Sequence, residues 1–257
     1  MISPEQLNIL LDAECKKAFK RLRNPINNRY AEYCKDVQKL ISAFHIDLDG
    51  SYNKDDAMHK YLLNKLNKDI NAKTDELFSF IEKKFDESID KLYDSCYNIT
   101  CRSLDVKNPT NDLVKSAIKS TDIENPWSGV HYRDRLKNHN ERLKFTLKSN
   151  LNSSISRAET FKKNYSVVHT SLSHQLNALD RLFKTEITAM RIQSQLSAYK
   201  VNGVVKIKAV MDGRCCDKCS SKHGKIVPVN KAIIGQNIPP MHTSCRCTIQ
   251  HIDKEEE

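Results

Sequence analysis

Two short stretches near the C-terminus, both rich in cysteine, constrain the fold of this chain most strongly. One contains Cys216-x-x-Cys219, and the other contains His242-x-x-Cys245-x-Cys247. A two-residue gap lets two side chains of a tight turn point at one ion, and thiolate and imidazole are the ligands that zinc prefers. Two such pairs supply the four ligands of a closed site, so the sequence predicts a structural Zn²⁺. The candidate metal ligands are Cys216, Cys219, His242, Cys245 and Cys247.

Other interpretations of these cysteines stay open. Buried or free thiols need no metal, and disulfides need an oxidising compartment. The chain has nine cysteines, an odd number that argues against a complete set of disulfides. The segment Met1–Gln6 lacks the basic start and apolar core of a signal peptide, which favours synthesis in the cytosol, where thiols stay reduced.

Some details of the ligand set are not decided by spacing. Cys215 directly precedes Cys216 and is an alternative ligand in the first pair. In the second pair, either Cys245 or Cys247 can serve as the fourth ligand. His223 is followed by a glycine, a combination more typical of a turn than of a metal ligand.

The distribution of glycine divides the chain into two parts. Four of the six glycines lie between Gly203 and Gly235, and none lies in 51–128 or in 130–202. A glycine-poor chain with long apolar periodicity is typical of helices, whereas a glycine- and proline-bearing tail is typical of turns and short strands. The predicted fold is therefore mainly α, an elongated helical body followed by a small zinc-pinned α+β module. The expected regions are an N-terminal helical region at 1–120, a second helical region at 121–202, and the zinc-binding module at 203–252.

Hydrophobic periodicity predicts the individual elements. Pro25 is expected to end the first helix, and Pro228 is expected to confine the second strand to a sheet edge. Residues 102–131 are interpreted as loops, with Trp127 as an anchor that packs on the helices. The predicted helices are 5–23, 28–44, 54–98, 133–157 and 171–199, and the predicted strands are 204–211 and 226–229.

The helix predicted at 54–98 carries an apolar stripe from Leu63 to Cys96. At 1.5 Å per residue such a helix is on the order of 60 Å long, which is long for a compact monomer. The sequence therefore predicts that the helical body self-associates or docks on a large partner. The module at 203–252 is below the size at which a core alone is sufficient, so we expect it to fold only with its metal.

The charge balance narrows the class of partner. The formal net charge is +10, and 29% of the residues are charged. Such an excess of lysine and arginine favours an anionic partner, nucleic acid first, although a solvated lysine-rich surface explains it equally well. No stretch approaches the roughly 20 apolar residues of a membrane span, so we expect no membrane partner.

Several motifs in the second half of the chain fall in a recognisable order. The motifs are Pro126-Trp127-Ser128-Gly129 with Tyr132 and Arg135, Leu182-Phe183-Lys184-Thr185-Glu186, Asp212-Gly213-Arg214 leading into Cys216-x-x-Cys219, His223-Gly224-Lys225, and Pro239-Pro240-x-His242-x-x-Cys245-Arg246-Cys247. This order resembles the head morphogenesis proteins of tailed phages, the Mu F-like minor head proteins, over about residues 125–250. Residues 1–120 carry no such motif.

The resemblance implies a minor virion component that is made in the host cytoplasm and is not an enzyme. It implies association with the phage portal or capsid proteins during head assembly, with contact to packaged DNA as a further expectation. The family pattern has threonine at the position of Cys215, which favours Cys216 and Cys219 as ligands. Some relatives carry histidine in place of one of the paired cysteines. The role of Thr185 and Glu186 stays open between a family function and an ordinary surface pairing.

Two other classes of function remain as alternatives. A zinc enzyme delivered with the DNA would be a deaminase or a nuclease. The deaminase pattern needs His-x-Glu with Pro-Cys-x-x-Cys, whereas here no glutamate lies near His223 or His242 and Pro240 precedes Met241 and His242. A nuclease needs an open metal position, which four or five protein ligands would close. A zinc-dependent DNA-binding module would need a recognition helix beside the metal, yet residues 220–240 show no helical period.

Overall fold

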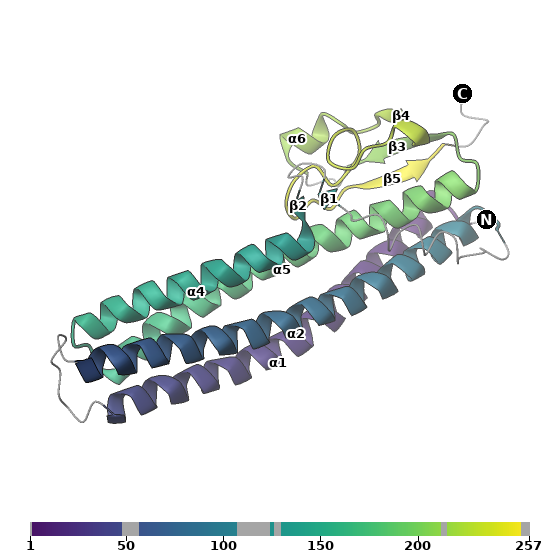
Figure 1. Ribbon diagram of the computed structural model, residues 1–257. Helices are drawn as coiled ribbons and strands as arrows, with labels where there is room; N and C mark the ends of the chain where they lie inside the picture. Colours follow the sequence, from purple (N-terminus) through teal and green to yellow (C-terminus); the bar gives the residue numbers. More distant parts are fainter. Residues whose placement is uncertain (1, 48–56, 107–123, 126–129, 212–214, 253–257) are drawn as a thin grey trace. The chain divides into compact units, whose positions relative to one another are not determined.

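A computed structural model describes residues 2–47, 57–106, 124–125, 130–211 and 215–252 (Figure 1). Long helices occupy most of this part of the chain, and a small antiparallel sheet with short connections follows them. The predicted fold class, a mainly helical chain with a small C-terminal α+β module, is confirmed. The expected anchor Trp127 lies outside the described residues.

The first helix, α1 (Pro4–Asp47), runs without interruption through Pro25. The prediction that Pro25 separates two helices is therefore wrong. The reason lies in the apolar stripe, which continues across the proline with Leu22, Ile26 and Tyr30 all buried. Proline removes one backbone hydrogen bond of the helix, and the burial of this stripe on both sides offsets that loss.

The start of α1 shows why the chain enters a helix there. Ser3 precedes the helix, and its hydroxyl accepts a hydrogen bond from the Gln6 N–H at 3.2 Å, while the Gln6 side chain accepts one from the Ser3 N–H at 3.0 Å. This reciprocal pair is a capping box. Pro4 is the first helical residue, a position where no backbone donor is needed.

The other long helices agree with the periodicity and differ at their ends. They are α2 (Ala57–Ser103), α4 (Tyr132–Ser156) and α5 (Phe161–Val201). The helix expected from 171 begins at Phe161, and its first turns are fixed in part by polar contacts. The buried side chain of Asn164 contacts the His45 ring at 2.9 Å and donates to the Glu159 carbonyl at 3.3 Å.

The apolar stripe of α2 is covered within the folded chain. Leu63 is partly buried, and the other members are buried, namely Leu66, Ile70, Leu77, Ile81, Phe85, Ile89, Leu92 and Cys96. Within the described residues, the stripe therefore leaves little exposed apolar surface to explain self-association, so it is a weak reason to expect it.

The chain divides into two compact units. One unit comprises residues 23–84 and 133–180. Its helices are joined by polar contacts as well as by apolar packing. The Tyr30 hydroxyl donates to the Leu172 carbonyl at 2.9 Å, and the Asn67 amide donates to Asn152 at 3.0 Å.

The other unit comprises residues 1–22, 85–132 and 181–257, and it contains the C-terminal module. Its sheet has the order β4-β3-β5 and is antiparallel throughout. The strands are β3 (Lys206–Val210), β4 (Ile226–Pro228) and β5 (Thr248–His251), with Ile207 opposite Val227 on one side and His251 on the other. The predicted strands correspond to β3 and β4, and β4 lies at the edge as expected. Two further strands, β1 (Glu124–Asn125) and β2 (Val130–His131), pair with each other.

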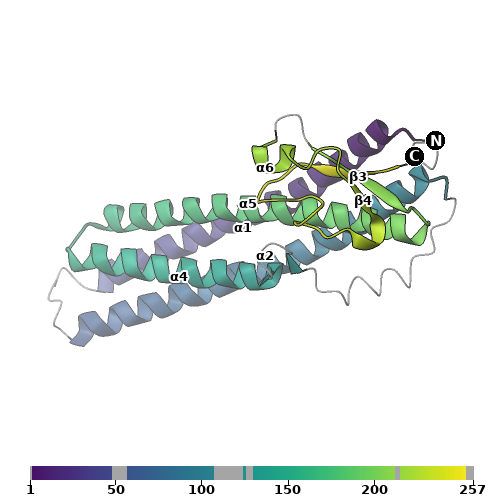
Figure 2. The same cartoon turned by 90° about the horizontal axis from the view of Figure 1, so that it is seen from above.

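One face of the sheet shares a core with α5. Its inner residues Ile207, Val227 and Ile249 pack with Ile192 and Leu196 from the last turns of α5. Figure 2 shows β3 and β4 beside the C-terminal part of α5. The Gln195 side chain also donates to the Ile249 carbonyl at 3.4 Å. The sheet thus packs on α5. This packing stabilises the module in addition to any metal, whereas the sequence led us to expect a module that folds only with its metal.

Candidate metal centre

The first cysteine pair lies on a single short turn. Cys216 is extended, with φ −77° and ψ 167°, and it immediately precedes α6 (Asp217–Ser220), which contains Cys219. The Cys219 N–H donates to the Cys216 carbonyl at 2.9 Å. This turn brings both thiols to the same side, with Cys219 buried and Cys216 exposed.

The second stretch is a turn that α5 supports. Cys245 N–H donates to the His242 carbonyl at 3.2 Å, and Ser244 adopts a left-handed conformation with φ 59°. The Ser244 N–H donates to the Thr185 hydroxyl at 2.9 Å, and that hydroxyl donates to the Arg181 carbonyl at 2.8 Å. Thr185 therefore links α5 directly to the second ligand turn.

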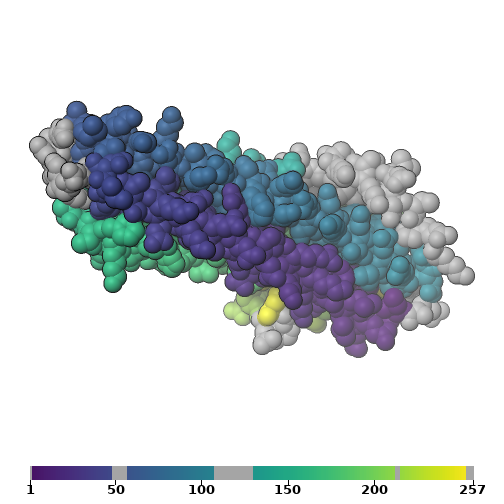
Figure 3. All heavy atoms as spheres, turned by 90° about the horizontal axis from the view of Figure 1, so that it is seen from below, coloured from purple at the N-terminus to yellow at the C-terminus, as the bar shows by residue number. Residues whose placement is uncertain are grey.

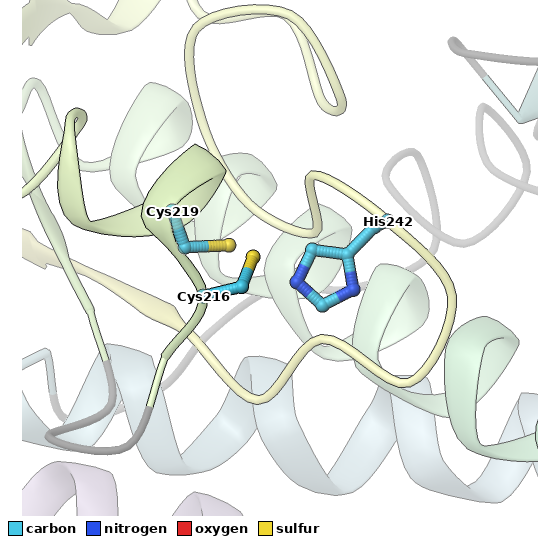
Figure 4. A group of neighbouring side chains, drawn as sticks. All are labelled: Cys216, Cys219 and His242. Atoms are coloured by element: carbon cyan, nitrogen blue, oxygen red, sulfur yellow. The ribbon is translucent and has the colours of Figure 1, made fainter.

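The structure brings all five predicted ligands into one cluster. The ligand atoms of Cys216, Cys219 and His242 lie within 4.8 Å of one another, and Figure 4 shows the two thiols and the imidazole facing each other. Cys219, Cys245 and Cys247 form a second group of the same size, so Cys219 belongs to both.

The spacing of the sulfur atoms fits a zinc ion. A tetrahedral site with Zn–S bonds of about 2.3 Å places neighbouring sulfurs about 3.8 Å apart. The Cys219 and Cys245 Sγ atoms are separated by 3.7 Å. The donor set, thiols with one imidazole, is also the set that a structural zinc site uses. The residues present therefore fit a zinc ion.

The hydrogen bonds of the cluster favour the thiolate form of Cys245. Hydrogen bonds from the Cys247 thiol and from the backbone N–H groups of Cys247 and Met241 lower the pKa of Cys245 to about 5, against the opposing effect of burial. Burial and the adjacent charge of Cys245 raise the pKa of Cys219 to about 12. Because metal ligands must be deprotonated, an entering cation would displace the Cys219 proton.

The surroundings of the cluster are apolar. Ala209, Met211 and Met241 are buried against Cys219, Cys245 and Cys247. Such a wall limits access of water to the thiol side of the site. It favours a closed structural centre over a catalytic one, which needs an open position.

Two residues near the cluster stand outside it. Cys215 is partly buried and packs against the apolar wall, but it belongs to neither group of candidate ligands. His223 accepts a hydrogen bond from the Met211 N–H at 3.3 Å. It therefore contributes to the local turn, as the sequence indicates. Residues 212–214, part of the motif before the first pair, lie outside the described residues.

Sequence reasoning did not find the supporting residues on α5. Thr185 and Glu186 are both buried, so an ordinary surface pairing is wrong for them. Their spacing on a helix carries no signal of a contact with a turn some 59 residues later in the chain. Of the two residues, Thr185 gives the stronger indication of a structural role, because a threonine among buried apolar residues needs a hydrogen-bond partner.

The fold and the cluster together define a mainly helical chain with a cysteine- and histidine-rich β module built onto its last long helix. The family model described as Phage Mu protein F like protein matches residues 146–250, which include the end of α4, all of α5 and the module through most of β5. The resemblance to the Mu F-like family is confirmed over that region. No curated protein and no solved structure matches the chain. None of the described helices has an apolar stretch that could cross a bilayer.

Proposed function

We propose that this chain is a minor head protein of a tailed phage that acts in head morphogenesis. The observation that carries the proposal is the match of residues 146–250 to the Phage Mu protein F like family. Its partners are then the portal or capsid proteins of the same phage. Its locations are the host cytoplasm during assembly and afterwards the virion.

The cysteine and histidine cluster serves, in this proposal, as a structural Zn²⁺ site. Four of the five candidates Cys216, Cys219, His242, Cys245 and Cys247 hold the ion, and Cys219 is required because it belongs to both groups. The ion ties the turn before β4 to the turn before β5. Its role is to fix the surface that these turns present, not to carry out chemistry.

An enzymatic role has less support. A nuclease centre binds its metal with carboxylates or histidines and keeps a position open for water. Among the described residues, the candidate ligands are cysteines and one histidine, and three of the thiols are buried. Contact with packaged DNA is a separate part of the proposal, and it rests on the net charge of +10.

Coexpression with the portal protein of the same phage tests the main proposal. We expect the two proteins to elute together from a sizing column, and we expect mass spectrometry to find this chain in purified virions. Absence from virions, with no portal or capsid complex, would exclude the role. Incubation with labelled DNA and divalent metal tests the enzymatic alternative, since a nuclease would give cleavage products.

A further inference from the structure

A cavity of about 730 Å³ lies beside the metal centre, within the unit that contains the module. One wall is the first half of α1, another is α5, and the third is the turn that carries Cys245. Figure 3 shows atoms of the C-terminal module, in yellow, next to the first half of α1, in purple. The cavity is therefore complete only when the module is folded against these helices.

The charge of the lining is strongly positive. Among the described residues that line the cavity, Lys16, Lys184, Arg191 and Arg246 are cationic and Asp12 is the one carboxylate. Asp12 is already paired with Arg191. Lys16 and Lys184 are exposed, so the rim of the cavity keeps an excess of positive charge.

Arg191 forms a fixed, buried part of the wall. Only 3% of it is exposed, and it donates to Asn8 at 3.1 Å and to Thr248 at 3.0 Å. Its Nε atom is buried and has no hydrogen-bond partner among the described residues. The guanidinium held in this way contributes fixed positive charge to the wall behind the exposed lysines.

Other parts of the lining are apolar. Phe19 and Ile187 contribute to the wall, and the Lys184 ammonium lies 5.3 Å from the centre of the Phe19 ring. A ligand that uses the whole cavity must therefore offer both anionic and apolar groups. Cavities of about 300–1,000 Å³ bind small ligands or a few side chains.

We propose that this cavity binds an acidic peptide segment of another protein. Carboxylates of the segment pair with Lys16 and Lys184, and an apolar side chain lies against Phe19 and Ile187. A peptide fits better than duplex DNA, because a duplex presents phosphates on a convex rod and has no group for the apolar walls. The proposal rests on charge and shape, and it does not require the phage assignment.

Fluorescence anisotropy on the full chain tests this binding. The probes are a short labelled peptide of alternating glutamate and leucine, the same peptide with glutamine, and labelled single-stranded DNA. We expect the glutamate peptide to bind about tenfold more tightly than the glutamine peptide, since several charge pairs contribute. The double variant Lys16→Glu/Lys184→Glu should lose that preference.

A matched control separates the cavity from the general positive charge. Lys35→Glu/Lys200→Glu makes the same charge change at exposed positions of α1 and α5 that do not line the cavity, and it should keep the preference. Lys16→Gln/Lys184→Gln serves as a milder variant if the reversal of charge disturbs folding. Equal binding of both peptides, equal loss in the control, or a loss of DNA binding in Lys16→Glu/Lys184→Glu that the control does not share would overturn the proposal.

Discussion

At the scale of single residues, the centre depends most on Cys219. This thiol belongs to both groups of candidate ligands and lies 3.7 Å from Cys245. Cys219→Ser removes a donor from both groups, so we expect this variant to lose bound zinc. A structural ion contributes on the order of 10 kcal/mol to the folded state. Zinc content by mass spectrometry of the purified chain measures this directly. Cys215→Ser is the matched control and should keep its zinc, and loss of the ion in that variant alone would exclude our ligand set.

His242 and Cys247 are expected to substitute for each other. Five candidate donors are available for a tetrahedral ion, and these two lie in different groups around Cys219. Each single variant, His242→Ala or Cys247→Ser, should therefore keep zinc but release it more readily to a chelator. The double variant should lose it. Complete loss in one single variant would identify that residue as an obligatory ligand.

Thr185 is expected to act as a positioning residue for the second ligand turn. Its hydroxyl accepts the Ser244 N–H at 2.9 Å, and Ser244 has the unfavourable φ of 59°. Thr185→Val keeps the volume and removes the acceptor, so we expect about 1 kcal/mol of lost stability and faster release of zinc. Thr185→Ser should restore both. Thermal unfolding with a parallel chelation assay measures the effect, and an unchanged Thr185→Val variant would contradict it.

At the scale of elements, α1 offers a direct test of the continuous helix. Pro25 lies inside the helix, where it removes a backbone hydrogen bond, and Pro4 lies at its first position, where it removes none. Pro25→Ala should raise the free energy of unfolding by up to about 3 kcal/mol, whereas Pro4→Ala should change little. Denaturant unfolding of both variants makes the comparison. Destabilisation by Pro25→Ala would show that the proline fits a local bend that the chain needs.

The same helix shows what periodicity in the sequence can and cannot predict. The apolar steps place the long helices well, yet the local rule for Pro25 fails because Leu22 and Ile26 are buried on either side of it. The early start of α5 escapes prediction because Asn164 is fixed by contacts far along the chain. The strand β5 has only four residues, too few for an alternating pattern to be distinctive.

The candidate site also contains residues that the sequence predicts and residues that it does not. The grouping of the five candidate ligands could be predicted because the spacing within each turn is a local property of the sequence. Their supports could not, since Thr185 and Gln195 reach the module only after α5 and the sheet have packed together. The shared core of Ile192 and Ile249 also changes the expected effect of the metal. Without zinc, the two ligand turns should become sensitive to protease while β3 stays protected on α5.

At the scale of the whole molecule, the position of the positive charge predicts how DNA would bind. Residues 204–257 contain nine basic and six acidic residues, so most of the net charge of +10 precedes residue 204. We expect binding that does not depend on sequence, with an affinity that falls linearly with salt on logarithmic scales, because phosphate contacts release condensed counterions. We also expect binding to persist when a chelator removes the metal. Electrophoretic mobility shifts at increasing salt, with and without chelator, measure both effects. Binding that ignores salt, or that disappears with the metal, would instead favour a zinc-dependent DNA-binding module.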